Sequence, residues 1–244
     1  MNSGYYAACA GLRTQTQALE LIANNLANLN TNGYRGQQPT FRSLLTGTWM
    51  AAGNPLNRAA NDFNVLGGSR LDLTPGNLQP TGNPLDLGLE GDGFFVVQTR
   101  AGARYTRNGN FQISPAGQLT TADGDPVLGE QGPLNLPSGP LAISADGTIS
   151  QDGAVAGKLQ LVDFPPGTPL GAEGTSYYSA PDGSAQPSLR VYVRQGMVES
   201  SNVNSVGAMV DLISVQRHAD MLERALSAYY NEFNRVATSD LPRV

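Results

Sequence analysis

The sequence of 244 residues contains few of the side chains on which catalysis and metal binding usually depend. Its one cysteine, Cys9, cannot form an internal disulfide, and its one histidine, His218, cannot build a histidine-rich metal site. The glycine-containing turns lack the spacing of a nucleotide-binding loop or of a calcium-binding loop. We therefore predict a protein without catalytic residues, cofactors or metal ions.

Positive charge is also scarce. The net charge is −5 and the only lysine is Lys158, so the clustered cations that a nucleic-acid partner requires are missing. No stretch of eighteen consecutive apolar residues is present, and we therefore expect no membrane-spanning helix. The N-terminus has no basic segment ahead of an apolar core, so we expect no cleaved signal peptide either.

What the sequence does contain is a regular apolar pattern near each end. At the N-terminus, apolar residues recur at steps of three and four, with Gln15 as the one polar interruption: Tyr5, Ala8, Leu12, Leu19, Ile22, Leu26 and Leu29. The same spacing returns near the C-terminus in Leu212, Val215, Ala219, Leu222, Leu226, Tyr229, Phe233 and Val236. A period of 3.5 residues is typical of coiled-coil helices. We predict that two terminal helices pair antiparallel, with Tyr5 near Val236 and Leu29 near Leu212.

A single pair of helices of this length is only marginally stable. The apolar surface that it buries roughly balances the conformational entropy lost when about sixty residues become ordered. We infer that other helices must surround the pair, as they do in a subunit of a larger assembly.

A run of asparagines ends the first pattern. Asn32-Gly33 is a strong signal for a helix stop and a turn. Asn24, Asn25 and Asn28 lie inside the predicted helix, where asparagine is a poor helix former. Two interpretations remain open, namely exposed residues at a fraying helix end and amides that bind neighbouring subunits.

Residues 35–84 contain many glycines and prolines, which break helices and strands. We predict an extended connector here, with disorder as the alternative. Within it, Phe41, Leu44, Leu45 and Trp49 have the spacing of a short amphipathic helix.

Residues 85–198 have the features of an all-β domain. Apolar or alternating runs predict strands at residues 85–89, 94–97, 111–113, 141–143, 158–162 and 189–193. Asparagine-glycine or aspartate-glycine pairs, which favour type I′ hairpin turns, occur at residues 108–109, 123–124, 146–147 and 152–153. The predicted fold class is α+β: helices within residues 1–34 and 199–244 pair as a coiled coil, and a hairpin-rich central domain forms a barrel or sandwich.

Three blocks of the sequence resemble the bacterial flagellar rod and hook proteins. The first is LIANNLANLNTNGYR at residues 21–35, which resembles their N-terminal signature. The second comprises LDL at 85–87, GDGFFVV at 91–97 and YTRNGNF at 105–111, which resemble the central domain of the longer rod subunits. The third comprises ESSNVNSV at 199–206 and AMVDLI at 208–213, which resemble their C-terminal signature. The blocks stand in the family's order and cover nearly the whole chain.

The resemblance implies a structural, non-enzymatic subunit of the flagellar basal-body rod, which polymerises into the shaft that transmits motor torque across the cell envelope. The implied partners are other rod and hook subunits, copies of the chain itself and the flagellar export apparatus, through which family members pass without a cleaved signal peptide. The implied location is the periplasm-spanning rod, close to peptidoglycan. The length of the chain and the segment at residues 126–133 favour the proximal rod type, with distal rod or hook subunits as alternatives.

We expect the assembly interface to lie on the terminal helices. The candidate residues are Leu12, Leu19, Ile22, Asn24, Asn25, Leu26, Asn28, Leu29, Leu212, Val215, Leu222, Leu226, Tyr229, Phe233 and Val236.

An alternative of another class is a secreted protein whose β domain binds or cleaves glycans. A groove lined by Tyr177, Tyr178 and Tyr192 would stack on sugars. Carboxylates for glycoside cleavage would come from Asp92, Asp123, Asp146, Asp152 or Asp163, although most of these lie in turn sequences that hairpins produce by default. The test that separates the two hypotheses is binding of the β domain to peptidoglycan.

Overall fold

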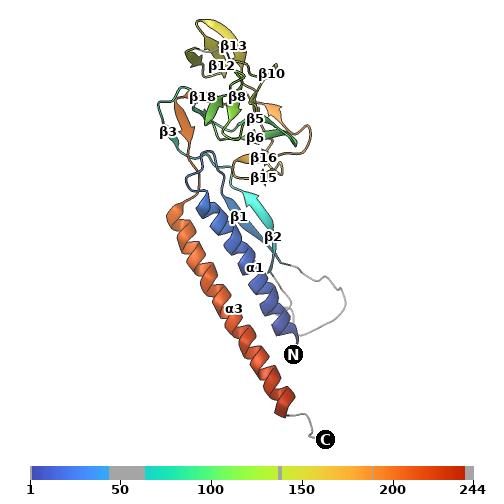
Figure 1. Ribbon diagram of the computed structural model, residues 1–244. Helices are drawn as coiled ribbons and strands as arrows, with labels where there is room; N and C mark the ends of the chain where they lie inside the picture. Colours follow the sequence, from blue (N-terminus) through green and yellow to red (C-terminus); the bar gives the residue numbers. More distant parts are fainter. Residues whose placement is uncertain (1, 44–63, 137–138, 189, 240–244) are drawn as a thin grey trace. The chain divides into compact units, whose positions relative to one another are not determined.

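The computed structural model describes residues 2–43, 64–136, 139–188 and 190–239 (Figure 1). These residues form two compact units. The helical unit is drawn from Met1–Ala27, Gln37–Arg70 and Asn204–Val244, and the β unit from Asn28–Gly36 and Leu71–Val203. The predicted α+β class is confirmed, with a helix near each end of the chain and a strand-rich region between them.

The helical unit contains helices α1 (Asn2–Ala27) and α3 (Ser205–Ser239) and a two-stranded sheet of β1 (Gln37–Ser43) and β2 (Asn64–Leu71). The two helices lie side by side and run in opposite directions, as Figure 1 shows. Leu222 packs against Gly11, where a Cβ atom would come within 3.3 Å of Leu222 Cδ1. This contact places the helices about two turns out of the predicted register, which pairs Gly11 with residue 230.

The most deeply buried face of α1 consists mainly of small residues. Ala8, Thr14, Ala18 and Ile22 are buried, whereas Tyr5 is 46% exposed. The larger residues of the predicted stripe, Leu12, Leu19 and Leu26, are half-buried. The reason is that α1 contacts both α3 and β1, so its covered face is wider than a coiled-coil seam.

The segment after α1 differs from the prediction in two ways. The helix ends at Ala27, five residues before the predicted stop at Asn32-Gly33, and residues 28–36 belong to the β unit. Phe41 lies in strand β1, not in an amphipathic helix, and Leu44, Leu45 and Trp49 lie outside the described residues.

The β unit is built around a six-stranded antiparallel sheet in the order β15-β16-β6-β5-β14-β17. Its strands are β5 (Phe94–Thr99), β6 (Gly102–Thr106), β14 (Leu161–Asp163), β15 (Gly171–Glu173), β16 (Tyr177–Ser179) and β17 (Gln186–Pro187). Side chains alternate between the two faces of a strand, and β5 is buried on both. Phe95 and Val97 enter the larger apolar core, and Phe94 and Val96 enter the smaller one.

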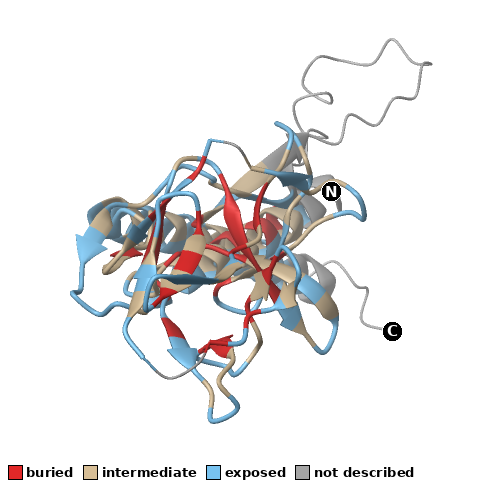
Figure 2. Cartoon of the chain, turned by 90° about the horizontal axis from the view of Figure 1, so that it is seen from above, coloured by how far each residue is buried: buried red, intermediate tan, exposed pale blue. Residues whose placement is uncertain are grey.

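Small antiparallel sheets complete the unit. They pair β3 (Leu78–Pro80) with β19 (Met197–Glu199), β4 (Leu87–Glu90) with β18 (Tyr192–Gln195), β7 (Phe111–Ile113) with β8 (Leu119–Thr121), and β9 (Leu128–Gly129) with β10 (Gly132–Pro133). A three-stranded sheet contains β11 (Leu141–Ile143), β12 (Thr148–Gln151) and β13 (Ala154–Lys158). Figure 2 shows the buried residues in red.

Only one of the four predicted hairpin turns has type I′ geometry. Asp152 and Gly153 both have positive φ, at 48° and 83°, and they connect β12 to β13. At residues 123–124 and 146–147 only the glycine has positive φ. At residues 108–109 neither residue does. Gly109 serves a different purpose there, because the main chain of Leu87 passes so closely that a Cβ would lie 1.6 Å from Leu87 O.

Replacement of Gly109 by alanine should therefore force two buried backbones apart. We expect Gly109→Ala to lower the free energy of unfolding by about 3 kcal/mol or more, because the atom in the way belongs to the main chain and cannot change rotamer. The measurement is urea unfolding followed by circular dichroism and tyrosine fluorescence, since the one tryptophan, Trp49, lies outside the described residues.

The matched control is Gly124→Ala, which has positive φ but no atom within 4 Å of the added Cβ. This variant should lose only about 1 kcal/mol, from backbone strain. Equal losses in the two variants would contradict the interpretation of Gly109.

Tyr178 on β16 joins the six-stranded sheet to residues 33–35. Its side chain is 2% exposed and its ring packs on Phe94 with centroids 5.6 Å apart. The hydroxyl accepts a hydrogen bond from Arg35 N at 3.0 Å and donates one to Gly33 O at 3.3 Å. Burial raises the pKa of Tyr178 to about 12.

The raised pKa predicts a pH-dependent contribution to stability. The folded chain holds the Tyr178 proton more tightly than the unfolded chain, whose pKa is near 10.0. The contribution is therefore complete below pH 10 and is lost as the pH rises towards 12. Tyr178→Phe should cost about 1–3 kcal/mol at pH 8, because Arg35 N and Gly33 O lose a buried partner. We expect the difference in unfolding free energy between the wild type and Tyr178→Phe to shrink above pH 10 in urea titrations, and a constant difference would refute the assignment.

Candidate functional site

A buried carboxylate at the end of β19 brings together four segments of the β unit that are distant in sequence. Glu199 is 0% exposed. Its Oε1 lies 2.6 Å from Arg35 Nη1 and accepts a hydrogen bond from Gly76 N at 2.7 Å, and its Oε2 accepts one from Arg107 Nη1 at 3.1 Å. Its main-chain oxygen accepts a hydrogen bond from Gly33 N at 2.7 Å. We call Arg35, Arg107 and Glu199 the buried triad.

The two guanidinium groups of the triad are unequally satisfied. Arg107 also donates from Nη2 to Gly91 O at 2.6 Å, and its Cζ lies 5.2 Å from the centre of the Phe94 ring. Arg35 Nη1 forms an ion pair with Glu199, but the geometry of this contact is not that of a hydrogen bond. Within the described residues, Arg35 Nε, Arg35 Nη2 and Arg107 Nε have no hydrogen-bond partner. The triad therefore buries a surplus positive charge together with unsatisfied donors.

Burial lowers the pKa of Arg107, the negative charge of Glu199 raises it, and the nearby positive charge of Arg35 lowers it. Arginine nevertheless keeps its charge in proteins. Removing a cation from water costs several kcal/mol, and two cations side by side repel one another as well. The arrangement therefore depends on Glu199, which is the one carboxylate paired with either arginine among the described residues.

Asn202 ties together the places where the chain enters and leaves the β unit. Its Oδ1 accepts a hydrogen bond from Gly36 N at 2.7 Å, and its Nδ2 donates to Asp72 O and Thr74 O, each at 2.9 Å. Its main-chain N–H donates to Tyr34 O at 3.3 Å. A side-chain amide has both donors and an acceptor, which is why one asparagine can join three segments of the chain.

Gly33 is required for the close approach of residues 28–36 to the rest of the unit. Its φ is 69°, and a Cβ at this position would lie 2.3 Å from the carbonyl carbon of Arg107. The predicted turn at Asn32-Gly33 is therefore also a packing position, where the left-handed conformation and the lack of a side chain are both needed.

Asn25 and Asn28 of the first signature are bound within their own chain, which neither sequence-based interpretation anticipated. Asn25 donates from Nδ2 to Gln37 O at 2.7 Å and accepts at Oδ1 from Gln37 N at 2.8 Å, so it pairs with β1 as a strand would. Asn28 is buried and its Oδ1 accepts a hydrogen bond from Thr31 Oγ1 at 3.1 Å. Asn24 is exposed.

The other predicted interface residues fall into three groups. Leu12, Leu19, Ile22, Leu26 and Leu29 are buried or half-buried, as are Leu212, Val215, Leu222 and Leu226. Tyr229 is 49% exposed. Phe233 and Val236 lie in α3, but their side chains lie outside the described residues. The first group is therefore at least partly covered by the chain itself, with Leu222 against α1.

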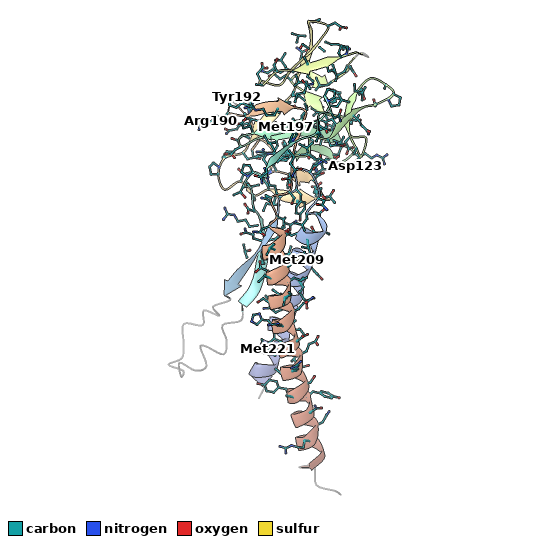
Figure 3. The ribbon with its side chains drawn as sticks, turned by 90° about the vertical axis from the view of Figure 1, so that its left-hand side faces the viewer. Asp123, Arg190, Tyr192, Met197, Met209 and Met221 are labelled. Carbon is teal, nitrogen blue, oxygen red and sulfur yellow. The ribbon has the colours of Figure 1, made fainter. Side chains whose placement is uncertain are left out.

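A second apolar surface on α3 was missed by the sequence analysis. Val206, Met209, Val210 and Ile213 are between 50% and 70% exposed, and Figure 3 shows Met209 on α3. Their spacing of i, i+3, i+4 and i+7 places them on one face of the helix. This face lies about 150° around the helix axis from the residues Leu212 to Leu226 of the predicted stripe. We call these four residues the bare stripe.

The alternative glycan groove is not assembled. Tyr178 is buried, so it offers no ring face to a sugar. The Tyr177 hydroxyl is bound by Thr121 and by Asp125, each at 2.9 Å, and burial raises its pKa. Tyr192 is 55% exposed but lies on β18, in a different sheet.

Two further observations concern the described residues only. No group of three or more His, Cys, Asp or Glu side chains in this part of the chain is arranged to hold a metal ion. None of the helices in it is both long enough and apolar enough to cross a bilayer.

Comparison with known protein families gives matches to three segments. Residues 6–35 match the family described as flagella basal body rod protein, residues 88–157 match the D1 domain of flagellar hook protein FlgE/F/G, and residues 194–229 match the C-terminal part of flagellar basal body rod FlgEFG protein. The buried triad draws one residue from each segment: Arg35 from the first, Arg107 from the second and Glu199 from the third.

Individual relatives extend this similarity over almost the whole chain. The flagellar basal-body rod protein FlgF of Escherichia coli (strain K12) is 36% identical over 254 residues, which cover 93% of this chain and 94% of the relative. FlgF of Salmonella typhimurium is 34% identical over 261 residues with the same coverage, and FlgG of Agrobacterium fabrum is 32% identical over 251 residues, covering 90% and 92%. The names of these families and relatives denote structural proteins. This chain belongs to the family of flagellar basal-body rod proteins and is a structural subunit, not an enzyme.

Proposed function

We propose that this chain is a subunit of the proximal rod, which polymerises into the shaft that transmits motor torque to the hook. FlgF is the proximal rod protein and FlgG the distal rod protein. The proximal type is supported because the FlgF relatives are up to 36% identical to this chain, whereas the FlgG relative of Agrobacterium fabrum is 32% identical. The distal rod is the second candidate, because that relative also covers nine-tenths of the chain.

The observation that carries the assembly role is that α3 has two apolar faces. One face packs on α1, where Leu222 contacts Gly11. The other is the bare stripe, whose side chains are 50% to 70% exposed and are not buried by the part of the chain that the structure describes. Exposed apolar patches of this kind mark interaction sites in soluble proteins. We infer that the bare stripe packs against helices of neighbouring rod subunits, including copies of this chain.

A repeated contact between unlike surfaces produces a helical polymer when the rotation between successive subunits does not close a ring. In this arrangement the helical units form the wall of the shaft, which lies in the periplasm close to peptidoglycan. We further propose that the chain reaches this location through the flagellar export apparatus without a cleaved signal peptide.

Charge on the bare stripe should block assembly. We expect Ile213→Glu to reduce the number of complete rods about tenfold or more, because a carboxylate buried between apolar helices costs several kcal/mol. Rods are counted by electron microscopy of purified basal bodies, and motility is scored in soft agar.

The matched control is Ser214→Glu, which adds the same charge one position along α3 and therefore about 100° around the helix. This variant should swim, and both variants should keep their helix content by circular dichroism. Normal rods in the Ile213→Glu strain would show that the bare stripe is not an assembly contact.

A strain lacking this chain distinguishes the proximal from the distal assignment. Basal bodies from this strain should contain a truncated rod above the inner-membrane ring, with a shorter remaining stub if the subunit is proximal than if it is distal. Complete rods with hooks on motile cells would contradict the proposed function altogether.

A further inference from the structure

The buried triad does not belong to either apolar core of the β unit. Neither core cluster contains a residue from 28–36 or from 199–203. The strands that supply the cores, such as β5, β14 and β18, lie between residues 87 and 195. The apolar cores can therefore form from residues 87–193, before residues 28–36 or Glu199 take their places.

Glu199 is the last of the interacting residues along the chain. Gly33 and Arg35 precede it by more than 160 positions, and Gly76 and Arg107 by more than 90. Without its carboxylate, the burial of Arg35 would place two like charges side by side, and no carboxylate among the described residues would be paired with either. Without the carboxylate, residues 28–36 keep their hydrogen bonds to Tyr178 but lack the ion pair that offsets the burial of Arg35.

We propose that Glu199 is a latch: residues 28–36 dock onto a preformed β core only when the carboxylate of Glu199 reaches Arg35 and Arg107. Docking also orders residue 76, whose main-chain N–H binds the same carboxylate. The latch couples both terminal signatures to the central domain in one step. This inference rests on the β unit alone and is independent of the position of the subunit in the rod.

Amide hydrogen exchange on the full-length chain tests the latch in two ways. In pulse-labelled refolding, the amides of β5 should become protected first, and those of Gly33 and Gly76 in a later phase. At equilibrium, Glu199→Gln should lower the protection of Gly33 and Gly76 about tenfold or more while the amides of β5 change less than about threefold. Simultaneous protection of all these amides, or an equal loss at β5 in Glu199→Gln, would overturn the proposal.

A matched control tests whether the effect of Glu199 depends on the burial of its ion pairs or on ion pairing alone. Glu173 pairs with Arg104 at 2.6 Å, the same distance as Arg35 to Glu199, but the side chain of Glu173 is 44% exposed. Glu173→Gln should leave the protection of Gly33 and Gly76 unchanged, because exposed ion pairs contribute little. A loss there as large as that in Glu199→Gln would overturn the latch.

A second variant uses the fact that Arg35 has more unsatisfied donors than Arg107. Arg35→Met removes the surplus cation and its unsatisfied donors, and leaves Arg107 paired with Glu199. Replacing buried charge by an apolar side chain of similar size is often neutral or stabilising. Arg35→Met should therefore lower the protection of Gly76 much less than Glu199→Gln does. Equal effects of the two variants would mean that the Arg35 ion pair, and not the carboxylate as a common acceptor, holds the segments together.

Discussion

One buried negative charge organises the β unit of this rod protein. Glu199 pairs with two cations and accepts hydrogen bonds from two main-chain amides, and these four partners come from three separate parts of the chain. The carboxylate accepts hydrogen bonds from groups that have no partner in the sheets. Because it is buried, the loss of one of its interactions weakens the others. Apolar packing gives the unit its cores, whereas the carboxylate determines how the terminal signatures join them.

Local patterns were sufficient to predict the two terminal helices and part of the strand structure, but they missed the strands within residues 35–84 and many short strands of the β unit. Strands β7 and β11 have the predicted bounds, and β5 extends the prediction by two residues, because each is a short apolar run between turn residues. The turns were harder, because an aspartate or asparagine before glycine favours positive φ but does not require it. At Gly109 the lack of a side chain matters for contact with Leu87, which no local pattern reveals.

The candidate site could not be predicted in the same way, because its partners are far apart in sequence. Arg35, Arg107 and Glu199 look like ordinary surface charges, and Asn202 like an ordinary turn residue. The one available signal was that all four lie inside the blocks that resemble the rod family. The bare stripe was overlooked for another reason: a 3.5-residue period identifies one apolar face of α3, and a second face of only two turns does not alter that period.

The paired helices are unequal in length, and the contact between Gly11 and Leu222 determines where the excess lies. With these two residues opposite one another, Ala27 at the end of α1 falls beside Val206, near the beginning of α3 at Ser205. At the other end, Asn2 falls beside Asn231, and α3 continues to Ser239, about 12 Å farther. The helix pair is thus flush at one end and overhanging at the other. A neighbouring subunit that packs at the overhanging end therefore meets a single helix, whereas the flush end presents both.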